Sequence, residues 1–389
     1  MGMRSPITFL AAVLAALACA APALAAKQHR TTTTATTTTT TTTTTAAAPA
    51  PTVTPTIPLR TDGRIPMGFN EDYSLTRIWA DSATAQPWVA ADADAAAAGG
   101  ATVSRTPLYW RSVQPTPTSW NWNTFDRIIG AYSGRGMRVI VNISAAPDWA
   151  KQNCGTGCVL NPANLADFSA FVKAVANRYG TMLAGIEIYN EPNSAKYWGA
   201  PADPEYYKQV LCAGYDGAKA AAVKLPVAGG SLAPNMQNIN GDIRMDQYLS
   251  RMFQAGAAPC MDVISFHPYP GSTDLTSSTS MFQQEFAQVR FLRDYYKPSM
   301  RLWVTETGLS LQTAGVTQDV QATTIPKIYD TIAAMPQHDV DVVVIHTLVQ
   351  SSGSLSYGLG QLVPDATGAP LFLPTPGYLA LQAEFGQGR

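Results

Sequence analysis

Short apolar segments alternate with longer amphipathic segments along the chain from residue 60 onward. The apolar segments are rich in Val, Ile and Leu, which is typical of buried parallel strands. We expect strands at 65–69, 102–105, 138–143, 185–189, 225–228, 262–266, 302–305 and 340–346. The segments between them have helical periodicity, and some begin with a capping residue before proline, as at Asn161-Pro162 and Asp203-Pro204. Helices are expected near 85–98, 123–134, 162–179, 204–222, 244–257, 279–296, 318–334 and 376–385.

Eight successive strand–helix units predict a (β/α)8 barrel, the TIM barrel, as one catalytic domain over residues 60–389. An open, doubly wound α/β sheet is the alternative architecture. That sheet would be expected to carry a glycine-rich phosphate loop after its first strand. The segment Gly68-Phe69-Asn70-Glu71 stands there instead, so the pattern favours the barrel.

The first 59 residues differ from the rest of the chain. Arg4, the uncharged apolar run over 7–21 and Ala23-Leu24-Ala25 form the pattern of a cleaved signal peptide, assigned to 1–26. Residues 27–59 are dominated by Thr, Ala and Pro, a composition that buries too little apolar surface to fold. We therefore expect a secreted, extracellular or cell-surface protein with a disordered linker before its catalytic domain.

Charge and cysteine content narrow the possible partners. The formal net charge is −1, so electrostatic attraction to nucleic acid or anionic membranes is not expected. Removal of the signal peptide leaves four cysteines, for which we expect the pairs Cys154–Cys158 and Cys212–Cys260. No histidine stands at metal-ligand spacing from a cysteine pair, so no metal is expected. The mature protein is expected to be a monomer without a membrane span.

Two glutamates stand at predicted strand ends, where barrel enzymes carry their chemistry. The fourth strand runs into Asn190-Glu191-Pro192, and the seventh strand ends at Glu306. Glycoside hydrolysis needs two such carboxyl groups, one to protonate the leaving oxygen and one ionised. An isolated strand-end glutamate is usually a solvated residue, but two facing one barrel mouth favour a glycosidase site.

At these residues the chain resembles the large clan of (β/α)8 glycoside hydrolases with glutamates on strands four and seven. It looks most like family 39, and family 5 shares most of the same features. The segments that carry the resemblance are Trp110–Pro115, Ile188–Asn193, Ile264–Pro270 and Tyr357–Leu359. The resemblance implies a retaining mechanism with Glu191 as acid/base and Glu306 as nucleophile, and it requires no cofactor. Asn190 is then expected to bind the sugar 2-hydroxyl.

The resemblance also implies supporting residues around the two glutamates. Tyr269 is expected to hydrogen-bond Glu306, and His267 is expected to line the bound sugar. Arg105 is expected to brace the nucleophile, with a purely structural ion pair as the alternative. Many clan members carry a Trp at the end of strand eight, where this chain has none; His346 or Gln350 is expected to contribute there instead.

Several tryptophans lie near the predicted strand ends and are candidate platforms for sugar rings. They are Trp79, Trp110, Trp149 and Trp198, with ordinary packing under long loops as the alternative for each. Trp120 and Trp122 precede a helix and are expected to pack within the fold.

The expected activity is internal cleavage of a β-linked polysaccharide. The β-xylosidases of family 39 add a β-sandwich for which this chain leaves no room, and rim tryptophans suit an open cleft. An exo-acting β-xylosidase or β-glucosidase is the alternative enzyme. A non-catalytic cell-surface carbohydrate-binding protein is the alternative of another class, although binding alone does not require the two glutamates.

Overall fold

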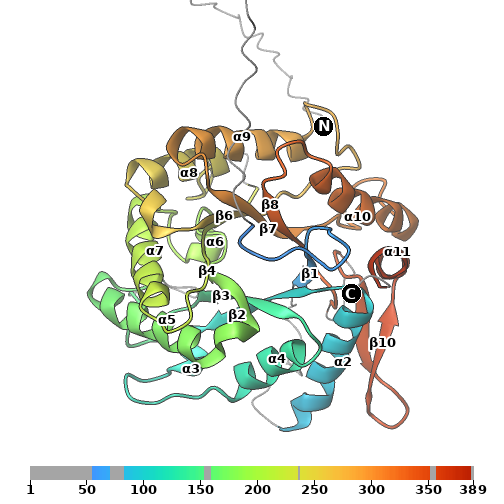
Figure 1. Cartoon of the computed structure of the whole chain (residues 1–389), viewed down its shortest axis with the longest axis horizontal. Helices are drawn as coiled ribbons and strands as arrows, with labels where there is room; N and C mark the ends of the chain where they lie inside the picture. Colours follow the sequence, from blue (N-terminus) through green and yellow to red (C-terminus); the bar gives the residue numbers. More distant parts are fainter. Residues whose placement is uncertain (1–54, 71–82, 153–158, 235–236, 351–355, 387–389) are drawn as a thin grey trace, which may run out of the picture. The chain divides into compact units, whose positions relative to one another are not determined.

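Eight parallel strands close into a barrel that is surrounded by helices (Figure 1). The computed structural model describes residues 55–70, 83–152, 159–234, 237–350 and 356–386. The predicted signal peptide, most of the predicted linker, Trp79 and the predicted Cys154–Cys158 pair lie outside these residues. Within the described part of the chain, no helix is both long and apolar enough to span a bilayer.

The strands follow the predicted positions closely, and the barrel fold is confirmed. They are β1 (Met67–Asn70), β2 (Val103–Tyr109), β3 (Arg138–Ser144), β4 (Leu183–Ile188), β5 (Val227–Leu232), β6 (Val263–Phe266), β7 (Arg301–Thr307) and β8 (Val340–Ile345). Each strand pairs in parallel with the next, and β1 pairs with β8 to close the barrel. Their carboxyl ends therefore meet at one mouth.

The predicted helices are also present, with short additional turns between them. The helical elements are η1 (Ala83–Ala85), α2 (Gln86–Ala98), α3 (Trp110–Val113), α4 (Asn123–Ser133), η2 (Pro162–Asn164), α5 (Leu165–Tyr179), η3 (Gly180–Met182), α6 (Ala195–Trp198), α7 (Pro204–Lys219), α8 (Met245–Gln254), η4 (Ala258–Cys260), α9 (Met281–Tyr296), α10 (Gln318–Ala333) and α11 (Pro376–Phe385). The side chain of Asn161 caps η2 and that of Asp203 caps α7, as their position before proline predicts. A hairpin that the sequence analysis missed, β9 (Gly360–Pro364) and β10 (Pro370–Pro374), precedes α11.

The disulfide between Cys212 and Cys260 is present, as predicted. It joins α7 to η4, the turn just before β6. The two cysteines are 48 residues apart in sequence, so the bond closes a long loop on the outer layer of the barrel.

The base of the barrel is closed by a residue that the sequence analysis assigned to the linker. Ile57 is 2% exposed and belongs to the apolar cluster formed by Val103, Ile140, Ala184, Ala228, Val263, Trp303, Val342 and Val344. Next to it, the Thr56 hydroxyl donates to Asp341 and accepts from the Trp303 indole N–H at 2.9 Å. The packed chain therefore begins before residue 60, because the apolar Ile57 fills the barrel interior.

Above this apolar layer the barrel interior becomes polar. Arg105, Asn142, Ser265 and Thr305 each stand two residues after a member of the apolar cluster on the same strand, and all four are fully buried. Because side chains alternate along a strand, these residues occupy the next interior layer toward the mouth. The sequence thus places a polar layer directly beneath the two strand-end glutamates.

Several buried carboxyl groups lie outside this layer, and Glu285 is one of them. Glu285 on α9 is 0% exposed, and neither carboxylate oxygen has a hydrogen-bond partner in the described structure. Burial raises the pKa of Glu285 well above its usual value, because it penalises the charged form.

Glu285→Gln should therefore raise the melting temperature near neutral pH and leave it nearly unchanged near pH 4. Below the unfolded-state pKa, both folded and unfolded chains hold the proton and no penalty arises. As pH rises, the unfolded chain loses the proton more readily, so wild-type stability falls; we expect a loss of roughly 1 kcal/mol or more by about pH 7. Thermal unfolding of both proteins across this pH range checks the prediction, and a pH-independent difference would contradict it.

Candidate active site

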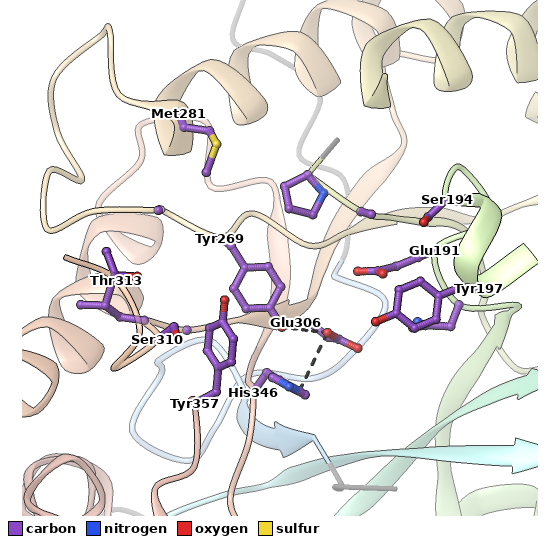
Figure 2. A pocket seen from close by; sticks show the side chains of 16 residues that line it. Glu191, Ser194, Tyr197, Tyr269, Met281, Glu306, Ser310, Thr313, His346 and Tyr357 are labelled. Carbon is purple, nitrogen blue, oxygen red and sulfur yellow. Dashed lines mark hydrogen bonds and ion pairs between the residues drawn. The ribbon is translucent and has the colours of Figure 1, made fainter. Parts of the chain in front are cut away.

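The two predicted catalytic glutamates meet at the barrel mouth (Figure 2). Glu191 follows β4 and is 8% exposed, and Glu306 lies within β7 and is 6% exposed. One carboxylate oxygen of each glutamate and one ring nitrogen of His267 lie within 4.8 Å of one another. The two carboxyl groups are therefore close enough to act on one bond.

The backbone holds Glu191 in an unusual conformation. Its φ is 45°, a left-handed value that costs a residue other than glycine of the order of 1 kcal/mol. The Glu191 N–H donates to the carbonyl oxygen of Ser231 on β5 at 2.9 Å, which ties this turn to the neighbouring strand. Pro192 follows directly and cannot extend the ladder. The carboxyl group is thus fixed at the rim of the barrel.

Glu306 is surrounded by hydrogen-bond donors. Its Oε1 accepts from Arg105 Nη1 at 2.6 Å and from Asn70 Nδ2 at 3.1 Å, and its Oε2 accepts from the Tyr269 hydroxyl at 2.8 Å. Burial alone would raise the pKa of Glu306, but electrostatic interactions with His267, Arg105 and His346 and the Tyr269 hydrogen bond together lower that pKa to about 2. Glu306 is an ionised carboxylate over the ordinary pH range.

Tyr269 serves this carboxylate as a neutral donor. Burial raises the pKa of Tyr269 well above its usual value, and the charges of Glu306 and Glu191 raise it further. Its hydroxyl therefore keeps its proton and donates to Glu306. Sequence analysis assigned Tyr269 this contact, and Arg105 a contact with the nucleophile; the structure places both groups accordingly.

Glu191 has different surroundings. Its Oε1 lies 2.8 Å from His267 Nδ1, and His267 Nε2 lies 3.2 Å from the Ser231 hydroxyl. The prediction that His267 lines the sugar site is wrong. His267 is 0% exposed and lies beneath the glutamates, where its Nδ1 is also 3.7 Å from Glu306 Oε2. His267 is the residue directly after β6, and its ring therefore lies in the polar interior of the barrel.

Arg105 and Asn190 link the two sides of the site. Arg105 Nη2 donates to Asn190 Oδ1 at 2.8 Å, which fixes the orientation of the amide. Asn190 also lines the cavity, so its NH₂ group is the part left to donate to a bound hydroxyl. The same Nη2 and the adjacent Nε of Arg105 pair with Glu187 Oε2. Arg105 is thus both a contact of Glu306 and a member of a buried ion pair with Glu187.

His346 lies at the end of strand eight and lines the cavity. Its Nδ1 lies 2.9 Å from Asn70 Nδ2, which acts as the donor, so a neutral ring carries its proton on Nε2. Its ring meets Tyr269 and Tyr357 edge to face, at centroid distances of 6.2 and 5.4 Å. This group of three rings stands where a tryptophan was expected from the resemblance.

Gln350 contacts the backbone of the nearby segment that contains Tyr357 and Gly358. Its Oε1 accepts from the backbone N–H groups of Tyr357 and Gly358 at 3.1 and 2.7 Å. Gln350 thereby positions the segment that carries Tyr357, and it is not among the residues that line the cavity.

The glutamates open into a cavity of about 510 Å³. Its wall combines loops after β4 and β5 on the Glu191 side with loops after β6, β7 and β8 on the other. The lining residues are Asn190, Glu191, Ser194, Tyr197, Ala233, Pro234, Tyr269, Gly271, Met281, Glu306, Gly308, Leu309, Ser310, Thr313, His346 and Tyr357. None of these residues is Lys or Arg, so this wall suits a neutral ligand better than an acidic one.

The prediction of sugar platforms at Trp110 and Trp198 is wrong. Trp110 is 0% exposed and packs against Phe168 and Phe171, and Trp198 is 1% exposed and packs against Tyr189. They lie on α3 and α6, short helices that turn these rings back into the core.

Of three other tryptophans, Trp122 and Trp149 are partly buried within the fold, whereas Trp120 is 43% exposed. Trp149 is partly buried, donates to the Gln114 carbonyl oxygen at 3.1 Å and does not line the cavity. Trp120 and Trp122 stack on each other and on Phe171; Trp122 packs as predicted, and Trp120 covers the stack from the surface.

Sequence analysis missed several residues of the site. Asn70, Asn142 and Glu187 are fully buried polar residues within apolar strands, and that pattern could have found them. Tyr197, which lines the cavity beside Glu191, lies on a helix too short to predict.

Among the described residues, Glu191, His267 and Glu306 form the one group with metal-ligand atoms this close together. Within this group Glu306 contacts Arg105 and Tyr269, and Glu191 contacts His267, an arrangement that suits acid/base and nucleophilic chemistry.

The same fold occurs in solved glycoside hydrolases. A family 39 glycoside hydrolase from Bacteroides cellulosilyticus WH2 has a TM-score of 0.63 at 16% identity, covering 85% of this chain and 66% of that one. The exo-β-1,4-mannosidase Op5Man5 from Opitutaceae bacterium strain TAV5 has a TM-score of 0.57 at 15% identity, covering 85% and 61%. This chain therefore spans less than two thirds of either protein.

A third solved structure is a GH5_18 variant from Streptomyces cattleya in complex with Manβ1-4GlcNAc. It has a TM-score of 0.62 at 16% identity, covering 84% of this chain and 81% of that one. At these identities the likeness shows the fold alone. No curated protein matches the chain.

The family itself is shown by a sequence match. The family model described as Cellulase (glycosyl hydrolase family 5) matches residues 70–343, which is more than half of the chain. The predicted clan is confirmed. The sequence predicted family 39 first and family 5 second. The sequence match is to family 5, and family 39 is represented among the similar structures. The chain, a closed (β/α)8 barrel, belongs to glycosyl hydrolase family 5.

Proposed function

We propose that this protein is a retaining β-glycosidase that hydrolyses O-glycosidic bonds by double displacement. The observation that carries the proposal is the approach of the two carboxyl groups, with one oxygen of Glu191 and one of Glu306 within 4.8 Å of each other. Retaining enzymes hold these groups about 5–5.5 Å apart, whereas inverting enzymes leave roughly 6.5–9.5 Å for a water molecule.

The surroundings of the glutamates favour one assignment of roles. Glu306 receives three donors and a full positive charge from Arg105, so it is the ionised nucleophile. It attacks the anomeric carbon while Glu191 gives its proton to the leaving oxygen, and the glycosidic bond breaks. Glu191 then takes a proton from water, whose oxygen attacks the anomeric carbon and releases Glu306.

Asn190 supports the transition state in this proposal. Its carbonyl oxygen is held by Arg105, and its NH₂ group can donate to the sugar 2-hydroxyl. Hydrogen bonds to this hydroxyl strengthen as positive charge develops on the sugar ring. They contribute to the several kcal/mol by which such contacts stabilise the transition state.

For the substrate, we propose internal cleavage of a neutral β-linked polysaccharide. The cavity extends to both sides of the glutamates, toward Ser194 and Tyr197 on one side and toward Ser310 and Thr313 on the other (Figure 2). Because Trp110 and Trp198 are buried, neither can serve as a platform for sugar rings at the rim of the cavity. Exo-acting cleavage is the second candidate, favoured by the exo-β-1,4-mannosidase among the similar structures. Chain lengths of the first products from a β-linked polysaccharide separate the two.

The N-terminal pattern supports action outside the cell. Residues 1–26 have the sequence of a signal peptide and 27–59 that of a Thr/Pro/Ala-rich linker. We propose that the enzyme is secreted or held at the cell surface, where a polysaccharide is accessible.

The stereochemistry of the first product tests the mechanism. Proton NMR during hydrolysis of an aryl β-glycoside should show the β-anomer of the free sugar first, followed by mutarotation. Initial release of the α-anomer would show inversion and overturn the double-displacement proposal.

A further inference from the structure

We infer that Glu187 is a positioning residue that sets the orientation and the effective charge of Arg105 toward the nucleophile. This inference rests on the proposed role of Glu306. Glu187 lies on β4, is 0% exposed and does not line the cavity, so it does not touch substrate. Its action must pass through Arg105.

The geometry makes Glu187 the anchor of the guanidinium group. Its Oε2 lies 2.7 Å from Arg105 Nε and 2.6 Å from Nη2, and it also accepts from Asn142 Nδ2 at 2.8 Å. Asn142 is itself held by the Tyr189 carbonyl oxygen at 2.8 Å. Because a guanidinium is planar and rigid, fixing its Nε edge also fixes the direction of Nη1, which donates to Glu306.

The charges point to a second role. Arg105 is fully buried between two carboxylates, Glu187 and Glu306. Burial alone would raise the pKa of Glu187, but Arg105, His267 and hydrogen bonds from Asn142 and Ser265 lower it, so Glu187 is ionised. Arg105 thus divides its attraction between two negative groups, and Glu306 remains more basic than it would be with Arg105 to itself.

Charged and titratable groups face Glu306 from every side of the site. They are Arg105 from β2, Glu191 after β4, His267 and Tyr269 after β6, and His346 after β8. All of them remain in a Glu187 variant. A change in the titration of Glu306 in that variant therefore reports on the Glu187–Arg105 pair.

Glu187→Gln is the decisive variant because it keeps the size and one acceptor oxygen but removes the charge. On 2,4-dinitrophenyl β-glycosides of xylose, glucose and mannose, we expect kcat on the accepted sugar to fall roughly 10- to 100-fold, with KM within about twofold. The acid limb of kcat/KM should move to lower pH, since Arg105 then acts on Glu306 alone. Glu187→Asp keeps the charge but shortens the side chain, so kcat should fall while the acid limb stays in place.

Glu285→Gln is the matched control, because it neutralises another buried glutamate that touches none of these groups; it should keep wild-type kcat and acid limb. Wild-type turnover and an unmoved acid limb in Glu187→Gln would overturn the inference. Equal losses of kcat in Glu187→Gln and Glu187→Asp, with no shift of the acid limb, would also overturn it, because that result indicates only a structural ion pair. If Glu187→Gln does not fold, wild-type kcat in Glu187→Asp overturns the inference. Activity in Glu306→Ala would instead overturn the proposed function.

Discussion

Glu306→Ala should lose at least about 10⁴-fold in kcat on every accepted substrate, the scale seen when a catalytic nucleophile is removed. The reason is that Glu306 is the ionised carboxylate of the site, with a pKa of about 2 and three donors fixing its oxygens. No other residue of the cavity wall offers an ionised group held in this way. Steady-state rates on activated aryl β-glycosides measure the loss.

Added azide provides a second readout for this variant. With the carboxylate gone, azide can attack the anomeric carbon from the same face and yield the α-glycosyl azide. Glu285→Gln serves as the control for a glutamate lost elsewhere in the fold. Wild-type turnover in Glu306→Ala, with wild-type thermal stability, would remove Glu306 from the mechanism.

The loss of activity in Glu191→Ala should be larger for leaving groups that depend more strongly on protonation. We expect losses of roughly 10²–10⁴-fold on glycosides with poor leaving groups, the usual contribution of a general acid, and much smaller losses in the first step on 2,4-dinitrophenyl glycosides. In this variant azide should intercept the glycosyl-enzyme and yield the β-glycosyl azide. Rates across a series of aryl glycosides check the trend.

The contacts of the two glutamates support the acid/base role proposed for Glu191. Glu191 contacts one ring nitrogen of His267, whereas Glu306 contacts Arg105, Asn70 and Tyr269. The balance of charge therefore favours ionisation at Glu306. Equal losses on good and poor leaving groups would contradict the acid role of Glu191.

The barrel and its two glutamates could be predicted because they follow from local patterns. Eight apolar segments with helical segments between them leave few architectures, and a polar residue at the end of such a segment must lie at the barrel mouth. Glu191 and Glu306 both fit this pattern, and the structure brings their carboxyl groups together. The end of the linker could not be predicted, because Ile57 is a single apolar residue in a proline- and threonine-rich segment.

The surroundings of the glutamates were harder to predict because they depend on side-chain direction. Trp110 and Trp198 stand just after strand ends, but short helices turn their rings into the core. His267 lies at the expected strand end but points beneath the site, where it meets both glutamates. Sequence spacing fixes the position of such residues along the chain and leaves these directions open.

The polar interior layer offers a sequence signal that can be used elsewhere. Asn142 and Glu187 each interrupt an otherwise apolar buried strand, and a buried polar group needs a partner. In this protein the partners are Arg105 and its neighbours, directly below Glu306. Polar residues inside predicted barrel strands therefore indicate the supporting contacts of an active site.

Capture of the covalent intermediate tests the central claim most directly. The enzyme is incubated with the 2,4-dinitrophenyl 2-deoxy-2-fluoro-β-glycoside of its accepted sugar, digested and analysed by mass spectrometry. A glycosyl group attached to the peptide that contains Glu306, and specifically to that side chain, is the predicted result. A label on any other residue, or full turnover of the fluorinated glycoside with release of the α-anomer, would contradict the double-displacement mechanism.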